Sequence, residues 1–591
     1  MEDQDVFSYI KSQETNWKTV RVPLTSAKDW SMHEHIERCT NVANGWYHTG
    51  KNDGIRPYDD LVTPIINVAF RSEGFDAKDI VPFVNNVSKS HMSFLIKKYA
   101  PQWNRKVELD TIIDDVVETS VIYDLVLVKN LDGKMPEVVD LKTIAFCVHT
   151  DVLAGPLCLK HQYSIADLVS FKGKWDDDKI DQAILMAKEE KKNSIAGDQT
   201  MKTPSKNIEV YELRGELPEL WLKKDGKPNT YVPQIHIVCF YTAQDGSRNG
   251  ITLYKGKDKK LSDNFKSLKI DRIRSKGRAC GRSIVESLFE EQVWNNYSAI
   301  KMKALLDSAV TLFLSDSDEL GGKKLSDLKS NTVLKQAKGD VTQKLDGNLQ
   351  NMQHFQTYSQ DLQTKARIKG SASEAQLGTN PVSGTPFALQ NLVVQQGQGI
   401  HEYRQGKVAT FFADQLYRDW ILHMMIADLD QGKNFSEELT LEELQEVVEA
   451  VSKNMVEEQK KEMILNGEPF EADTEEKLKM KYSDEVRIQH GKRAFFEVIK
   501  GELKEIPIDV MVNVAGKQRN MAQNADKITN ILREVLKNPQ AFQQIPGVGK
   551  VFNELLEESG LSSIDFTEIT TPVVPTPQPT PIQPQLAPQG A

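Results

Sequence analysis

The sequence predicts an α+β protein, and three observations lead to this class. Segments enriched in β-branched and aromatic residues, as strands are, recur in the first half of the chain at 157–163, 208–214, 234–242 and 250–254. Apolar residues at three- and four-residue spacing predict long helices at 283–309, 349–368 and 387–429. The 591 residues are 39% hydrophobic and 27% charged, a composition typical of globular proteins with real cores.

Composition and charge narrow the class further. No run reaches the ~18 apolar residues that a membrane helix needs, and the start of the chain (MEDQDVFSYIKSQETNWK) is unlike a signal peptide. The five cysteines are scattered and odd in number, which fits a reducing compartment better than a disulfide framework. A net charge of −10 argues against a surface covered in positive charge for holding nucleic acid, although local positive charge stays compatible.

Catalytic motifs are missing from the sequence. It contains no G-x-x-x-x-G-K-[ST], no G-x-S-x-G and no H-E-x-x-H. His33, Glu34, His35 and Cys39 could be imagined as zinc ligands, but structural zinc sites use four ligands in paired spacings and no second pair follows. We therefore expect no enzyme, no metal site and no cofactor.

Residues 1–282 are predicted to form one region with a curved, largely antiparallel sheet. Besides the strands above, the pattern predicts helices at 109–119 and 176–193 and strands at 121–129 and 137–149. The region ends in a basic stretch, 255–282, with eleven positive and three negative residues. This stretch is either a solvated loop or a surface that faces nucleic acid or an acidic neighbour.

The first long helix should begin at a capping box formed by Ser283 and Glu286. We expect its apolar face to hold Val285, Leu288, Phe289, Tyr297, Ile300, Ala304 and Leu305. A polar insert follows, with short strands at 310–314 and 332–335, and leads into the second helix at 349–368.

The third long helix follows a segment, 370–386 (GSASEAQLGTNPVSGTP), that is too rich in Gly, Ser, Thr and Pro to be regular for long. Gly397, Gly399 and Gly406 lie within that helix and would each cost ~1 kcal/mol relative to Ala if exposed. They indicate a kink or close packing against a neighbouring backbone.

The last part of the chain changes character several times. Residues 437–485 are acidic, 495–514 regain strand character, and helices are predicted at 518–537 and 550–559. Residues 570–591 contain seven of the 24 prolines, which is typical of an extended, disordered tail.

The order helix, small polar insert, helix, Gly/Thr/Pro-rich loop and very long helix resembles the portal (head-to-tail connector) proteins of tailed bacteriophages. HTDVLAGPLCLKHQYSIADL (149–168) looks like a segment of the portal wing, where a strand, a Gly-Pro turn and a Ser-capped helix follow one another. GTNPVSGTP before the long helix is similar to the portal tunnel loop. The likeness covers most of the chain in the order of its elements, whereas each motif is weak by itself.

The resemblance implies a division of the chain into the parts of a portal subunit. These parts are an α+β wing (1–282 and 431–515), two stem helices (283–309 and 346–369), a small α/β clip (310–345), a tunnel loop (370–386), a long kinked helix (387–430), a helical crown (516–568) and a disordered tail (569–591). Subunits would form a homo-oligomeric ring, expected to be a dodecamer, at one vertex of the virion capsid after assembly in the host cytoplasm. Its implied partners are double-stranded DNA, the terminase, the major capsid protein and head-tail adaptor or tail proteins, with no membrane involved.

The resemblance also implies which residues lie near DNA. The channel residues would be the tunnel loop and its approach: Lys365, Arg367, Lys369, Gly370, Gly378 and Gly384. The three cations are expected to have no acidic partner, and the glycines would make the loop deformable. Basic clip residues could face DNA or partner proteins: Lys323, Lys324, Lys329, Lys335 and Lys338. Aromatic residues in the long helices are expected to pack within and between subunits: Trp294, Tyr297, Tyr403, Phe411, Phe412 and Trp420.

Two other classes of function stay open from the sequence. Residues 545–550 (IPGVGK) before a helix resemble a helix-hairpin-helix motif, whose backbone amides bind phosphate, although acidic residues follow it. The chain could therefore be a nucleic-acid-binding protein that forms no portal. It could also be a virion scaffold or adaptor without a DNA channel.

Overall fold

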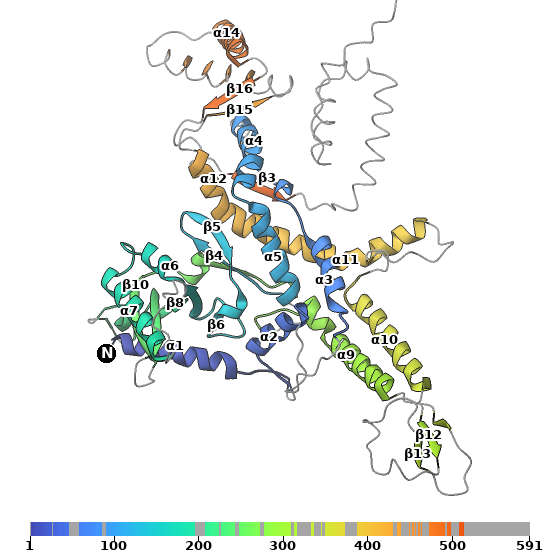
Figure 1. Cartoon of the computed structure of the whole chain (residues 1–591). Helices are drawn as coiled ribbons and strands as arrows, with labels where there is room; N and C mark the ends of the chain where they lie inside the picture. Colours follow the sequence, from blue (N-terminus) through green and yellow to red (C-terminus); the bar gives the residue numbers. More distant parts are fainter. Residues whose placement is uncertain are drawn as a thin grey trace, which may run out of the picture. The chain divides into compact units, whose positions relative to one another are not determined.

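The computed structural model describes residues 2–25, 28–45, 58–84, 90–194, 207–223, 226–227, 229–242, 248–271, 277–308, 312–315, 333–335, 344–345, 349–372, 377, 387–429, 434–438, 472–490, 493–497 and 508–512, and isolated positions between 448 and 463 (Figure 1). The protein is of the α+β class, as the sequence predicts. The chain divides into two compact units, of which the first comprises Met1–Asn85, Tyr99–Asp428 and Pro507–Val514. The predicted crown and tail lie outside the described residues.

The first unit begins with an α+β region. Its helices are α1 (Glu2–Thr19), α2 (Met32–Ala43), α3 (Val62–Glu73), η1 (Ala77–Asp79), α5 (Leu109–Tyr123), η3 (Leu141–Thr143), α6 (Ile165–Ser170), α7 (Asp177–Ser194), η4 (Glu219–Trp221) and α8 (Leu261–Asn264). Helix α4 (Ser90–Lys106) crosses the boundary between the two units. Helix α5 extends four residues beyond the predicted 109–119, because Val121 and Tyr123 are buried on its inner side.

The main sheet of this region has five antiparallel strands in the order β10-β9-β8-β7-β6. Their bounds are β6 (Ile144–Phe146), β7 (Leu157–Tyr163), β8 (Ile208–Pro218), β9 (Tyr231–Thr242) and β10 (Arg248–Lys257). These strands contain the four that the sequence predicts most clearly. The register shifts between Thr252 and Tyr254, which marks a bulge in the edge strand.

Alternating side chains of the main sheet form two cores. Ile208 and Val210 pack on one face with Leu168 of α6 and Ile180 of α7. Tyr211 and Leu213 pack on the other face with Val6 and Ile10 of α1. Figure 1 shows α1 on one side of the sheet and α6 and α7 on the other. The sheet is thus covered by helices on both faces, which fixes the register of its strands.

Smaller sheets complete the described residues. They are β1–β2 (Val22–Thr25 and Lys28–Trp30), β11-β4-β5 (Phe265–Leu268, Val126–Leu131 and Lys134–Val138), β3–β17 (Ile80–Val84 and Ile508–Val512), β13-β12-β14 (Val333–Lys335, Leu312–Ser315 and Lys344–Leu345), and β15–β16 (Asn434–Glu438 and Arg493–Glu497) in the second unit. The second unit also contains α14 (Ala472–His490). The pairing of β17 with β3 brings residues 508–512 back to the first hundred residues, a contact that no local pattern could predict.

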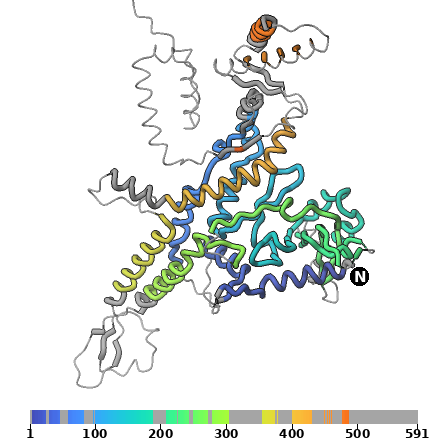
Figure 2. Tube along the Cα trace, turned by 180° about the vertical axis from the view of Figure 1, so that it is seen from behind, coloured from blue at the N-terminus to red at the C-terminus, as the bar shows by residue number. Residues whose placement is uncertain are grey.

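Three long helical runs follow the α+β region, close to where the sequence predicts them. They are α9 (Ile284–Ser308), α10 (Leu349–Lys369) and a continuous run made of α11 (Phe387–Phe411), the π-helix η7 (Phe412–Ile421) and α12 (Leu422–Leu429). Figure 2 shows α9 and α10 side by side, in agreement with their many contacts.

A buried cluster of charged residues joins the long helix to the α+β region. In this Arg404 cluster, the guanidinium of Arg404 donates to Glu73 at 2.9 Å, to Asp124 at 3.0 Å and to the carbonyl of Ser120 at 3.0 Å. His401 lies 3.0 Å from the same Glu73 carboxylate. All four charged or titratable side chains are at most 6% exposed. Helices α3, α5 and α11 are therefore held together through buried charge.

The Asp124 end of the Arg404 cluster also reaches the chain just before α9. Asp124 ends α5 with a left-handed backbone, and its carboxylate accepts the backbone N–H of Asp271 at 3.0 Å. Its carbonyl accepts the N–H of Gly281 at 3.1 Å. A Cβ on Gly281 would overlap the Asp124 carboxylate, so only glycine fits there. Burial raises the pKa of Asp124 despite the adjacent guanidinium.

A second buried cluster sits where α9 begins. In this Arg278 cluster, Arg278 donates two hydrogen bonds to Glu286, at 2.9 and 2.8 Å, and one to the carbonyl of Gly281 at 3.0 Å. Ser283 caps the helix through the N–H of Glu286, as predicted, but the Glu286 side chain is taken by Arg278. His35 of α2 lies 4.0 Å from Glu286 and 3.8 Å from the thiol of Cys39.

Replacing Arg404 by Met should destabilise the first unit strongly. The variant leaves two buried carboxylates without their cation, which costs about 3–5 kcal/mol of unfolding free energy. Arg418→Met is the control, because Arg418 is half exposed beside Asp414 and Asp419 and should contribute about 0–1 kcal/mol. Urea unfolding followed by circular dichroism measures both, and equal losses would contradict the assignment.

Stability should also depend on pH through His35. Burial lowers the pKa of His35 to about 4, so the unfolded chain takes up this proton first as the pH falls. From pH 7 to pH 4, the unfolding free energy of wild type should therefore fall by about 3 kcal/mol more than that of His35→Phe. Urea unfolding at each pH, followed by circular dichroism, measures this difference.

The matched control for the pH experiment is His33→Phe, two residues away on the same helix and only partly buried. This variant keeps the buried His35 imidazole, so it should retain the His35-dependent loss of stability that wild type shows. A His35→Phe curve that is parallel to wild type would show that His35 carries no such pH dependence.

Candidate functional site

The antiparallel pair α9–α10 contains three of the predicted channel residues, Lys365, Arg367 and Lys369, and several of its inner contacts are polar. Gln292 of α9 donates to the carbonyl of Asp59 at 2.7 Å and accepts the N–H of Leu61 at 2.9 Å. Asn295 donates to the Asp59 carboxylate at 2.8 Å and accepts the hydroxyl of Ser359 of α10 at 2.7 Å. Buried polar groups with satisfied hydrogen bonds fix one register between the two helices and the 59–61 segment.

The apolar face predicted for the first helix is wrong in its second half. Val285 and Leu288 are buried as expected, but Tyr297 is 47% exposed. From Glu291 onward the buried positions are polar: Glu291, Gln292, Asn295, Asn296 and Ser298. The spacing rule assumes that burial follows hydropathy, and here hydrogen bonding to the chain at 59–61 decides which face is inside.

The three cations at the end of α10 have different surroundings. Lys365 is exposed and Arg367 is half-buried. Lys369 donates to Glu291 of α9 at 2.5 Å. The expectation that all three lack an acidic partner is therefore wrong for Lys369. The pair is long-range in sequence, so neighbouring residues gave no sign of it.

Gly370 has a packing role that the sequence did not indicate. It is buried, and a Cβ there would come within 2.2 Å of Ile65 of α3. The helix ends in a Schellman motif, in which Ser371 adopts a left-handed backbone and the N–H groups of Ser371 and Ala372 bond to the carbonyls of Ile368 and Arg367. This turn directs the chain into the loop. Gly378 and Gly384 lie outside the described residues.

The insert between α9 and α10 contains a small mixed sheet. Strand β12 pairs in parallel with β13 and antiparallel with β14, close to the strands predicted at 310–314 and 332–335. Of the predicted basic residues, Lys335 is the last residue of β13. Lys323, Lys324, Lys329 and Lys338 lie outside the described residues.

The long helix deviates from regular geometry at a place other than its glycines. A Cβ on Gly399 or Gly406 would meet nothing within 4 Å, so these two positions show no close packing. The ten residues of η7 form a π-helix instead. Phe411 and Phe412 are buried at its start and Trp420 near its end, whereas Tyr403 is 58% exposed.

Several residues of the basic stretch 255–282 form contacts within the chain. Arg278 is buried against Glu286, Lys266 pairs with Asp419 at 3.3 Å, and Lys259 pairs with Asp132 at 3.1 Å. Lys269 donates to the carbonyl of Arg278. Part of the positive charge of this stretch is therefore used within the chain, whereas Lys255, Lys257, Lys260 and Arg282 are exposed.

One open pocket of about 440 Å³ lies among α2, α3, α5 and residues 138–142. Its polar lining includes Asp115, Glu118 and Asp140, which are exposed, and it contains none of the predicted site residues. Burial raises the pKa of Asp115. Within the described ranges, no three His, Cys, Asp or Glu side chains are arranged to hold a metal ion.

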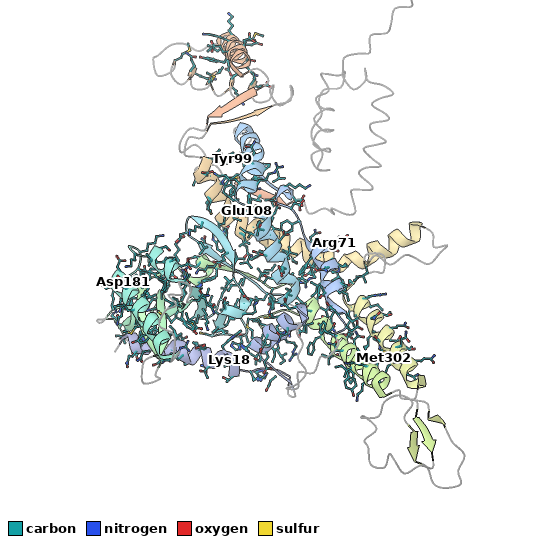
Figure 3. The ribbon with its side chains drawn as sticks, viewed as in Figure 1. Lys18, Arg71, Tyr99, Glu108, Asp181 and Met302 are labelled. Carbon is teal, nitrogen blue, oxygen red and sulfur yellow. The ribbon has the colours of Figure 1, made fainter. Side chains whose placement is uncertain are left out.

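Neither a protein-family model nor a curated protein sequence matches the chain. None of the helices in the described part of the chain combines the length and hydropathy required to cross a bilayer. Figure 3 shows the side chains of α9 and α10, with Met302 of α9 labelled.

Replacing Gly370 by Ala should destabilise the junction of α10 with α3. The new methyl group would overlap Ile65, which costs about 1–3 kcal/mol of unfolding free energy. In the double variant Gly370→Ala/Ile65→Ala the loss should be at least about 1 kcal/mol smaller than the sum of the two single losses. Gly399→Ala is the control, since its Cβ meets open space and the change should stabilise the helix by up to about 1 kcal/mol. Additive losses at Gly370 and Ile65 would refute the contact.

Proposed function

We propose that this chain is the portal protein of a tailed bacteriophage. It would form a ring at one capsid vertex, conduct the genome during packaging and ejection, and dock first the terminase and then adaptor or tail proteins. In this proposal it acts by geometry and charge rather than by catalysis.

The order and pairing of the helices carry the proposal. Two antiparallel helices, α9 and α10, are connected by an insert that contains the sheet β13-β12-β14. The far end of α10 leads through residues 370–386 into the helical run Phe387–Leu429. This is the arrangement that a portal subunit uses for its stem, clip, tunnel loop and long helix, and it supports the assignment of those names to this chain.

The charges of the pair suit a channel that conducts DNA without holding it. Each lysine or arginine that neutralises a phosphate adds sequence-independent affinity, and a ring multiplies every residue by the number of subunits. At the approach to the proposed tunnel loop, Lys369 is neutralised by Glu291, and the whole chain has a net charge of −10. Low affinity for passing DNA requires few unneutralised positive charges along the channel, and the Lys369–Glu291 pair supports the proposal on this point.

Negative-stain electron microscopy of the purified full chain tests the proposal. We expect closed rings with an axial hole wide enough for a DNA duplex, formed at high protein concentration and with capsid scaffold protein present. A uniform monomer or dimer under both conditions would overturn it. That outcome would favour a nucleic-acid-binding role for residues 545–550, which lie outside the described residues. A closed assembly without a hole would favour a scaffold or adaptor.

A further inference from the structure

The outer face of α9 is more aromatic than its inner face, which is the reverse of an ordinary surface helix. Trp294 is 51% exposed and Tyr297 47% exposed, and their rings meet edge to face at 5.9 Å. They belong to a stripe at four-, three- and four-residue spacing, with Glu290 before them and Lys301 after them, both exposed. Because burying aromatic surface is favourable, this stripe has the character of a surface that a partner covers.

Helix α10 presents a similar stripe. Tyr358 and Ile368 are 40% and 73% exposed, and Asp361 and Lys365 lie between them on the same helical face. Leu349–Thr364, sixteen residues in all, contain five glutamines and a single charged residue, Asp361, in a chain that is 27% charged. Depletion of charge together with exposed aromatic residues is typical of the centre of a protein interface.

Charge and register indicate that the two stripes complement each other between copies. Within one chain, Glu291 bonds to Lys369 and Asn295 bonds to Ser359, which places Glu290 near the height of Lys369 on α10. Lys365 lies four residues, about one helical turn, before Lys369. Both stripes are exposed, so they point away from the α9–α10 contact, and Glu290 and Lys365 make no ion pair among the described residues.

We propose that the exposed stripe of α9 (Glu290, Trp294, Tyr297, Lys301) packs against the exposed stripe of α10 (Tyr358, Asp361, Lys365, Ile368) of a second copy of this chain. The contact joins two different faces, so it is heterologous and can close into a ring. Glu290 of one copy faces Lys365 of the next, and Trp294 and Tyr297 pack on Tyr358. This inference rests on the proposed ring, and it places Lys365 against a neighbouring subunit instead of DNA.

Charge reversal and light scattering test the contact in the full chain. Glu290→Lys and Lys365→Glu should each lower the assembled fraction by about tenfold or more at the wild-type assembly concentration, and the double variant should recover it. Trp294→Glu/Tyr297→Glu should lose assembly as well. Tyr231→Glu is the control, since Tyr231 of β9 is 62% exposed and outside both stripes. Thermal unfolding midpoints near wild type show that the variants fold.

The outcomes separate this proposal from the proposed function. Rings that assemble equally well in wild type, Glu290→Lys and Trp294→Glu/Tyr297→Glu would overturn the contact and leave the portal assignment standing. A wild-type dimer or open oligomer that these variants disrupt, with rescue by the double reversal, would support the contact and overturn the portal assignment. A wild-type chain that stays monomeric over the whole concentration range, with and without scaffold protein, would overturn both.

Discussion

The ion pairing of Arg404 with Glu73 and Asp124 is the constraint on which the arrangement of the first unit depends. Two carboxylates buried together repel each other and lose their hydration, so they are tolerated only where a cation of fixed geometry lies between them. Arg404, on the long helix, supplies that cation. The two carboxylates come from Glu73 at the end of α3 and from Asp124 at the end of α5. A shift of any one helix would leave a buried charge unpaired, so the three are held in a single arrangement.

The same constraint extends from the long helix to the start of α9. Asp124 binds the backbone at Asp271 and Gly281, and Gly281 in turn accepts a hydrogen bond from Arg278, which also holds Glu286. The α9–α10 pair is thus anchored at one end by charge, along its length by hydrogen bonds to residues 59–61, and at the end of α10 by Gly370 against Ile65. Each anchor is specific in geometry rather than in hydropathy, so together they hold the pair in one orientation.

Contacts that depend on geometry between distant residues are those that the sequence did not predict. Spacing and propensity predicted α7, α9, α10, the long helix and four of the main strands, because those signals are local. Capping of α9 by the Ser283 hydroxyl was predicted for the same reason. The second half of the predicted capping box, a bond from the Ser283 N–H to the Glu286 side chain, was wrong because that side chain binds Arg278. The Lys369–Glu291 pair, the Arg404 cluster and the pairing of β17 with β3 depend on residues 78 or more positions apart, and no local pattern records them.

The mismatch between prediction and structure on α9 is itself informative. The residues predicted to share one apolar face lie on two, with Val285 and Leu288 inside and Tyr297 outside, next to the exposed Trp294. Within one chain, the half-exposed rings of Trp294 and Tyr297 bury little apolar area, while the buried amides of α9 are hydrogen-bonded. In the contact proposed between copies, a neighbour would cover the outer face: the polar contacts would fix the register within each copy, and the aromatic stripe would supply the area buried between copies. The composition of α9 supports that proposal.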